Sequence, residues 1–259
     1  MLRLPKLDRI LTVFCIQPTT FFLRRFMENY SSTYGNSAAQ AAPQERASFI
    51  RKTYLHLAAA ILAFIVLETD LFTSGAADVI ASTMFGLSWF IVLALFMGVS
   101  FLANWWAHSS TSTPLQYLGL GLYIVAEAVI FVPLLFMVRN FSGDDTILKA
   151  GIVSLGLFGG LTATVFITKK DFSFLGPILT IGGFIALAFI AASLLIGFSL
   201  GSLFAFIMVA FAATAILYST SNVLHQYHPS QHVAASLSLF ASVALLFWYI
   251  LSIFGSSDD

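Results

Sequence analysis

Seven long apolar runs, each about the length of a membrane-crossing helix, constrain this chain more than any other feature of its sequence. A helix needs roughly 20 mainly apolar residues to cross the hydrocarbon core of a bilayer. Polar or turn-forming residues separate the runs, whose expected bounds are 52–73, 84–107, 114–138, 146–168, 174–197, 201–225 and 232–254. The sequence therefore predicts an all-α, polytopic membrane protein with seven transmembrane helices and the lipid bilayer as its main partner.

Composition supports a membrane location and narrows the function. Hydrophobic residues make up 59% of the chain and charged residues only 9%, whereas soluble domains carry about 25% charged residues. A formal net charge of zero provides no basic surface for phosphates, so no nucleic-acid partner is expected. The single cysteine, Cys15, excludes an intramolecular disulfide and a cysteine metal site. We expect no cofactor and no metal site.

Two segments of different character are expected. Residues 1–45 combine scattered basic residues with a stretch rich in Ser, Asn, Gln and Ala, which predicts a flexible cytoplasmic tail. Residues 46–259 form the predicted seven-helix transmembrane domain. Met27 is an alternative start, in which case residues 1–26 are an extension of the gene prediction.

The placement of Lys and Arg predicts the orientation. Ten of these residues lie on the side of the N-terminus, and only Arg139 and Lys149 lie on the opposite side. Without residues 1–26, five Lys and Arg residues lie on the side of the N-terminus and two on the opposite side, so the predicted orientation is the same. Because Lys and Arg concentrate in cytoplasmic segments, the N-terminus is expected in the cytoplasm and the C-terminus outside. With no clear organelle-targeting signal, we expect a bacterial inner (plasma) membrane.

Small residues suggest which helices pack closely, since small side chains let helix backbones approach in a membrane. Such residues occur in the fourth and fifth runs as Gly156, Gly159, Gly160, Gly182 and Gly183. The sixth and seventh runs are rich in Ala and Ser, and are expected to form the packed interior. The alternative is that these residues reflect only the general composition of membrane helices.

Glu127 is the candidate for chemistry inside the membrane, because it lies near the middle of the third run. A carboxyl group at that depth is costly and should face the bundle interior, either protonated or paired. It can belong to an ion or proton pathway. The alternative is a structural role, hydrogen-bonded to a serine or a backbone carbonyl.

Other polar groups have simpler explanations. Glu68 and Asp70 lie near the outer end of the first run, where exposure at the membrane interface accounts for their charge. Alternatively, with Asp78 they form an acidic outer vestibule that attracts cations. Histidines near 225–232 are interpreted as loop residues rather than metal ligands. The chain contains no His-Glu-x-x-His pattern and no phosphate-binding loop, so no enzyme is predicted.

Three segments carry a family resemblance. They are Thr168-Lys-Lys-Asp-Phe-Ser-Phe-Leu-Gly-Pro177, Ile216-Leu-Tyr-Ser-Thr-Ser-Asn-Val-Leu224 and Ala235-Ser-Leu-Ser-Leu-Phe240. Over about 46–259 the chain resembles the Bax inhibitor-1 family. The resemblance implies seven helices with the last enclosed by the other six. It also implies calcium leak, protection from cell death and, for bacterial relatives, modulation of a membrane-bound AAA protease.

The chain departs from that family at an informative place. Calcium-leak members carry two aspartates on the sixth and seventh helices, and the resemblance aligns them with Ser219 and Ser242. Two hydroxyls cannot titrate near neutral pH. Two hypotheses follow. The protein conducts calcium ions or protons through Glu127, Ser219 and Ser242, with Glu68 and Asp70 as further candidates. Alternatively, it is a non-conducting regulator that binds a membrane protein such as that protease.

Overall fold

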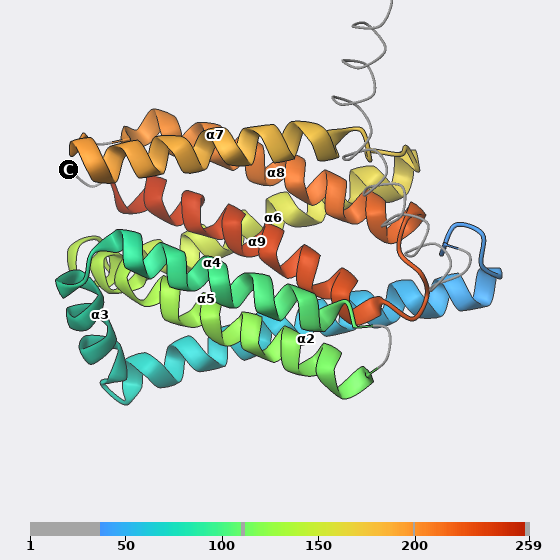
Figure 1. The fold of residues 1–259 in the computed structure, drawn as a ribbon, viewed down its shortest axis with the longest axis horizontal. Coiled ribbons are helices and arrows are strands. Elements are labelled where there is room, and N and C mark those ends of the chain that lie inside the picture. Colours follow the sequence, from blue (N-terminus) through green and yellow to red (C-terminus); the bar gives the residue numbers. More distant parts are fainter. Residues whose placement is uncertain (1–36, 110–111, 199, 257–259) are drawn as a thin grey trace, which may run out of the picture.

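A computed structural model describes residues 37–109, 112–198 and 200–256 of the chain. In these ranges the structure contains helices and no strands (Figure 1). The eight helices are α2 (Pro43–Thr73), α3 (Ala76–Gly86), α4 (Trp89–Ala107), α5 (Thr113–Phe141), α6 (Asp144–Thr168), α7 (Leu175–Ile196), α8 (Gly201–His225) and α9 (His232–Gly255). All except α3 are long and apolar enough to cross a membrane. The predicted all-α architecture with seven transmembrane helices is confirmed.

The expected bounds differ from the structure mainly at two helices. Helix α2 begins at Pro43 rather than at 52, because proline fits the first turn of a helix. Charged residues lower the hydropathy of this first turn, so the apolar run appeared to begin later. The expected run 84–107 is divided, since α3 ends at Gly86 and Leu87 is extended before α4 begins. The domain boundary at residue 45 stays a prediction, and most of the expected tail lies outside the described residues.

The buried core lies along α5 and α9 rather than along α8 and α9. About half of the apolar window of each is buried, 56% in α5 and 50% in α9, compared with 22% in α8. Phe131 of α5 stacks on Phe247 at 5.6 Å between ring centroids and meets Trp248 edge-on at 5.0 Å. The expected packed interior is confirmed for α9, whereas α8 packs closely on α9 but is buried mainly in its second half.

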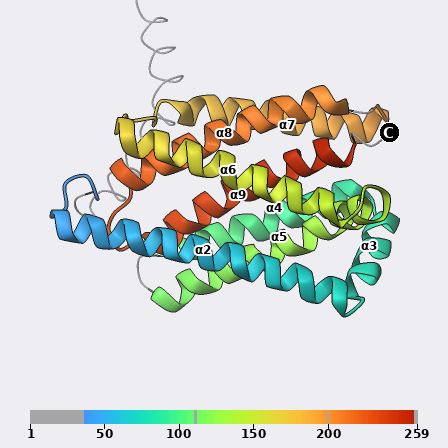
Figure 2. The same cartoon turned by 180° about the vertical axis from the view of Figure 1, so that it is seen from behind.

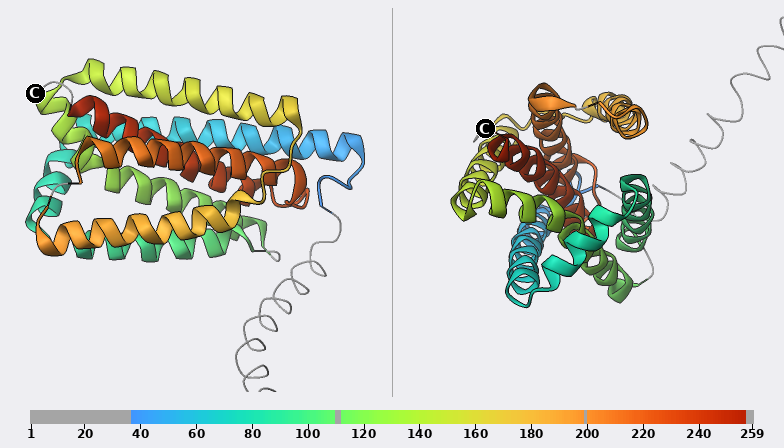
Figure 3. Two further views of the ribbon diagram at one scale, coloured as in Figure 1. Left: turned by 90° about the horizontal axis from the view of Figure 1, so that it is seen from above. Right: turned by 90° about the vertical axis from the view of Figure 1, so that its left-hand side faces the viewer.

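Helix α9 contacts α2, α4, α5, α6 and α8. Helix α7 lies at the edge of the bundle against α8, as an end-on view shows (Figure 3). Ala186 is the single buried residue of α7, so most of this helix is left to face lipid. That all six other spans enclose α9 stays a prediction.

Close helix packing occurs at a glycine that the sequence did not single out. A Cβ atom at Gly119 in α5 would lie 2.5 Å from the Ala103 carbonyl oxygen and 2.6 Å from the Ala107 nitrogen, both in α4. Gly182 faces Phe211 of α8 in a similar way, at 2.9 Å. By contrast, the three expected packing glycines of α6 have no atom within 4 Å of such a Cβ, so that prediction is wrong for Gly156, Gly159 and Gly160.

The loop that joins α6 to α7 explains the polar part of the sequence motif. Asp171 Oδ1 accepts hydrogen bonds from the Ser173 backbone N–H at 2.9 Å and from Ser221 Oγ at 3.3 Å. The Phe172 backbone N–H donates to the same Ser221 hydroxyl at 2.8 Å. The Ser173 N–H in particular holds the pKa of Asp171 below its usual value. The loop therefore attaches the start of α7 to α8.

Candidate functional site

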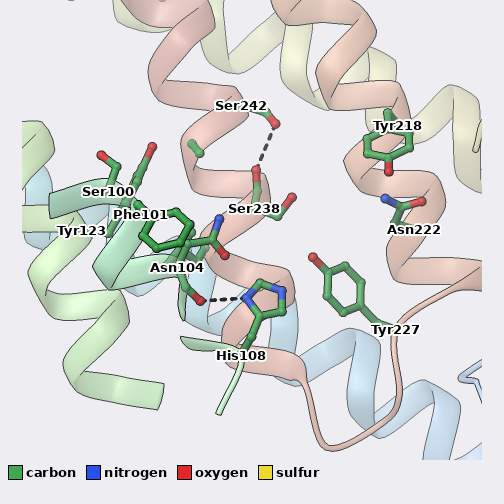
Figure 4. A pocket seen from close by; sticks show the side chains of 12 residues that line it. Ser100, Phe101, Asn104, His108, Tyr123, Tyr218, Asn222, Tyr227, Ser238 and Ser242 are labelled. Atoms are coloured by element: carbon green, nitrogen blue, oxygen red, sulfur yellow. Dashed lines mark hydrogen bonds between the residues drawn. The ribbon is translucent and has the colours of Figure 1, made fainter. Parts of the chain in front are cut away.

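A cavity of ≈580 Å³ opens among α4, α5, α8 and α9, near the loop that joins α8 to α9. We call it the first cavity (Figure 4). Most of its side chains carry hydroxyl, amide or imidazole groups, and they are Ser100, Asn104, His108, Tyr123, Tyr218, Asn222, Tyr227, Ser238 and Ser242. Such groups offer hydrogen-bonding oxygens without a fixed charge. The first cavity can therefore hold water or a weakly bound cation.

A second cavity, of ≈590 Å³, lies toward the opposite end of the bundle. Its lining comes from α4, α5, α7, α8 and α9, and it contains Glu127 together with Tyr249 and Ser252 among mainly apolar residues. Glu127 is 6% exposed, as the sequence predicts for a carboxyl that faces the interior. This cavity is the less polar of the two.

Three residues line both cavities: Tyr123 of α5, and Ala241 and Ser242 of α9. Tyr123 is held in place from the side, since its ring meets Phe240 edge-on at 6.1 Å. We call these three residues the partition. The two cavities therefore adjoin at these three residues, one cavity lying near one end of the bundle and the other toward the opposite end.

The two predicted serines lie together at the partition, to which Ser242 belongs. Ser219 Oγ of α8 is 3.1 Å from Ser242 Oγ and 3.1 Å from Ser238 Oγ, both in α9. Ser242 Oγ also donates to the Ser238 carbonyl oxygen at 2.9 Å. These hydrogen bonds join α8 to α9 at the depth where the resemblance places an aspartate pair. Ser238 was not predicted, although it precedes Ser242 by one helical turn.

Glu127 lies one helical turn after Tyr123 in α5, close enough for the phenol and the carboxyl to interact. The carboxyl shares the second cavity with Ser242. The structure therefore brings Glu127, Ser219 and Ser242 into one region.

Glu68 and Asp70 do not belong to this region, and they do not lie together. Asp70 and Asp78 are exposed, whereas Glu68 is only 7% exposed and lines a separate cavity among α2, α5, α6 and α9. Exposure at the interface is therefore the wrong explanation for Glu68. An acidic vestibule that contains all three carboxyls is not formed.

The histidines make ordinary polar contacts. His56 Nε2 lies 3.0 Å from the Tyr117 hydroxyl, which links α2 to α5, and His225 Nδ1 lies 3.0 Å from the Ser221 carbonyl oxygen. Within the described ranges no group of three or more His, Cys, Asp or Glu side chains is placed to hold a metal ion.

Residues 46–259 match the family described as "Inhibitor of apoptosis-promoting Bax1". The chain belongs to this family. Its membership agrees with the resemblance found in the sequence and with the seven membrane-crossing helices, so the protein is a multi-pass membrane protein of the Bax inhibitor family.

Relatives of this family occur in distant organisms. The chain is 32% identical to Protein LIFEGUARD 4 of Arabidopsis thaliana, over 84% of this chain and 88% of the relative. It is 32% identical to Bax inhibitor 1 of Schizosaccharomyces pombe, over 84% and 79%. An uncharacterised protein of Pseudomonas aeruginosa is 31% identical over 66% of this chain and 76% of the relative.

Several residues of the first cavity were not found by sequence reasoning. Tyr218 and Asn222 lie within a segment that was recognised, four residues apart and therefore on one face of α8. That spacing was the available signal. For Asn104 and Ser100 of α4 the same four-residue spacing exists, but no pattern indicated which face of α4 meets α9.

Proposed function

We propose that this protein is a cation-leak pathway whose route runs from the first cavity, across the partition, to Glu127 in the second cavity. The observation that carries the proposal is the partition itself. Tyr123, Ala241 and Ser242 each line both cavities, so the two spaces adjoin at these side chains, and we propose that their movement joins the cavities.

The chemistry of the route suits weak, transient binding. Calcium ions take six to eight oxygen ligands, and tight sites use several carboxylates. This route offers hydroxyl and amide oxygens and one carboxyl, Glu127. Conduction requires that an ion bind well enough to enter and weakly enough to leave. We therefore propose slow leak of calcium ions or protons rather than storage of an ion.

The serine contact is the proposed closed state. At the partition, Ser219 Oγ is hydrogen-bonded to the hydroxyls of Ser238 and Ser242, and Ser242 Oγ donates to the Ser238 carbonyl oxygen. A neutral cluster carries no charge change between pH 5 and pH 8, because hydroxyls do not titrate there. Any pH dependence of opening is therefore proposed to come from Glu127 and not from this contact.

We also propose that the first cavity faces the cytoplasm. The described cations at its end of the bundle are Arg46, Arg51, Lys52, Lys169 and Lys170, and cytoplasmic segments are enriched in such residues. The proposed location is a bacterial inner membrane, with the bacterial relative as support. The C-terminus then lies outside, which a C-terminal reporter fusion tests directly.

The decisive experiment measures calcium flux into liposomes that contain the purified protein, at pH 6 and pH 8. We expect flux through the wild type and a loss of most of it in Glu127→Gln. Glu68→Gln is the matched control, because Glu68 is equally buried but lies in a different cavity. Equal flux in the wild type and Glu127→Gln contradicts the role of Glu127. Absence of flux from folded protein overturns the proposal and leaves the non-conducting regulator of a membrane-bound protease.

A further inference from the structure

A third cavity, of ≈570 Å³, lies on another side of the bundle from the proposed route. Its walls are α2 and α6, its floor is α9, and the end of α5 closes one side. Figure 2 shows α9 in the space between α2 and α6. Exposed apolar residues such as Ile65 and Ile152 line its edges, so it is open to the acyl chains of the bilayer. We call it the lateral groove.

Glu68 is the unusual residue of this groove. It is 7% exposed, and neither carboxyl oxygen has a hydrogen-bond partner. Buried polar groups are nearly always hydrogen-bonded, and an unpaired one costs free energy. An unpartnered carboxyl that lines an open, mainly apolar groove is therefore placed to form a hydrogen bond or an ion pair with a polar group of a ligand.

The other polar groups of the groove are already engaged. The hydroxyls of Thr69 and Ser154 donate to backbone carbonyls of their own helices at 2.7 Å. Arg139 Nε lies 3.3 Å from Asp144 Oδ1, and its guanidinium lies 5.4 Å from the centre of the Phe72 ring. The pair of Arg139 and Asp144 is neutral as a unit. Among the described polar groups of the groove, the Glu68 carboxyl is therefore the one without a partner.

From these observations we propose that the lateral groove binds a long-chain primary amine, with its ammonium on Glu68 and its alkyl chain between α2 and α6. The unpartnered carboxyl of Glu68 is an acid that pairs with a basic nitrogen as carboxylate and ammonium, and the apolar walls accommodate a chain. The volume lies within the range of small-molecule sites, about 300–1,000 Å³. This inference does not depend on ion conduction.

The bilayer determines which contact gives selectivity. An alkyl chain gains little by moving from lipid into an apolar groove, because lipid is equally apolar. An ammonium paired with a buried carboxylate forms a charge-assisted hydrogen bond, which is about twice as strong as a neutral one. Preference for an amine over an alcohol of the same length should therefore depend almost wholly on Glu68.

The test uses the full chain in phosphatidylcholine nanodiscs with dodecylamine as the probe, and with 1-dodecanol and dodecanoate as matched ligands. Thermal unfolding reports binding. A diazirine-bearing alkylamine, followed by peptide mapping, reports the site. We expect stabilisation by dodecylamine alone, labelling within 147–155, and at least about a tenfold loss of apparent affinity in Glu68→Gln.

Two variants keep the test decisive if Glu68→Gln folds poorly. Gly151→Leu fills the groove and leaves Glu68 intact, and no atom lies within 4 Å of a Cβ at Gly151. It should abolish labelling. Glu127→Gln removes an equally buried carboxyl from a different cavity and should leave binding unchanged. Equal binding of dodecanol, preferred binding of dodecanoate, or labelling that persists in Gly151→Leu overturns the proposal.

Discussion

The packing of α4 against α5 depends on Gly119, and Gly119→Ala tests that dependence. The added Cβ would lie 2.5 Å from the Ala103 carbonyl oxygen, 2.6 Å from the Ala107 nitrogen and 3.0 Å from the Trp106 Cβ. Two of these three atoms belong to the backbone of α4, so no side-chain rotation relieves the contact. Ordinary contacts of this kind begin near 3.4 Å. The helices must therefore separate by about 0.8–0.9 Å, which is typical of overpacking that costs about 1–3 kcal/mol.

Gly121→Ala is the matched control, because it makes the same chemical change two residues away on α5. Gly121 is exposed, and no atom lies within 4 Å of a Cβ there. In a helix, alanine is favoured over glycine by about 1 kcal/mol, so this variant should be unchanged or slightly more stable. Both variants gain the same helix propensity, and the difference between them isolates the cost of the contact.

The assay is thermal unfolding of the purified protein in one detergent, read by intrinsic fluorescence. We expect a clearly lower midpoint for Gly119→Ala than for Gly121→Ala. Calcium flux should change as well in Gly119→Ala, because α4 and α5 carry Asn104 and Tyr123 to the first cavity. Equal midpoints for the two variants would refute the predicted steric cost, since they would mean that α4 and α5 can accommodate a Cβ at residue 119 without separating.

Two further predictions concern the loops. Asp171 has a lowered pKa in the folded protein, so its stabilisation is complete above its unfolded pKa, about 3.9, and is lost as the pH falls through the lower folded value. Asp171→Asn should therefore be less stable than the wild type at pH 6 by up to about 1 kcal/mol in thermal unfolding, since the group is largely solvated. The difference should shrink as the pH falls below the unfolded pKa and vanish below the folded one. A difference that stays constant as the solution is acidified contradicts this. Ser112 Oγ accepts a hydrogen bond from the Leu115 N–H at 3.4 Å at the start of α5, so Ser112→Ala should cost about 1 kcal/mol, whereas Ser112→Asp should restore stability in the same measurement.

The sequence predicts the seven spans well because the signal for each span is its length in apolar residues, and this depends on no neighbour. Helix α3 was missed for the same reason. With 11 residues it is too short to cross a membrane, and hydropathy joined its end to α4. The extended backbone at Leu87 that separates the two helices is marked in the sequence only by Gly86, the last residue of α3.

Burial of single residues is harder to predict, because it depends on which helix lies opposite. Glu68 and Asp70 are two residues apart near the end of one apolar run, yet one is buried in the lateral groove and the other is exposed. Similarly, Gly119 packs closely, whereas the glycines of α6 face open space. Composition cannot distinguish these cases, because it does not say which face of a helix meets a neighbouring helix.

The candidate site was partly predictable because its residues lie at helical spacing in recognisable segments. Ser219 and Ser242 were found through a resemblance, and the structure brings their hydroxyls to 3.1 Å. The partition was not predictable. It depends on a side chain from α5 and two from α9 that meet between two cavities, and cavities are a property of packing.

The partition leads to a prediction that distinguishes a gate from a binding group. Tyr123 is 9% exposed and lines both cavities, so Tyr123→Ala removes the largest side chain that separates them. If this ring blocks the route, calcium flux should rise in Tyr123→Ala even though loss of a buried aromatic costs about 3–5 kcal/mol of stability. Tyr123→Phe is the matched control, because it keeps the ring and removes only the hydroxyl beside Glu127.

The two variants separate the possible roles of Tyr123. Increased flux in Tyr123→Ala with unchanged flux in Tyr123→Phe identifies the ring as the barrier. Reduced flux in both variants instead identifies the hydroxyl as a group that the ion contacts, together with the Glu127 carboxyl. Unchanged flux in folded Tyr123→Ala contradicts the proposed route, because the barrier must then lie where Tyr123 does not reach.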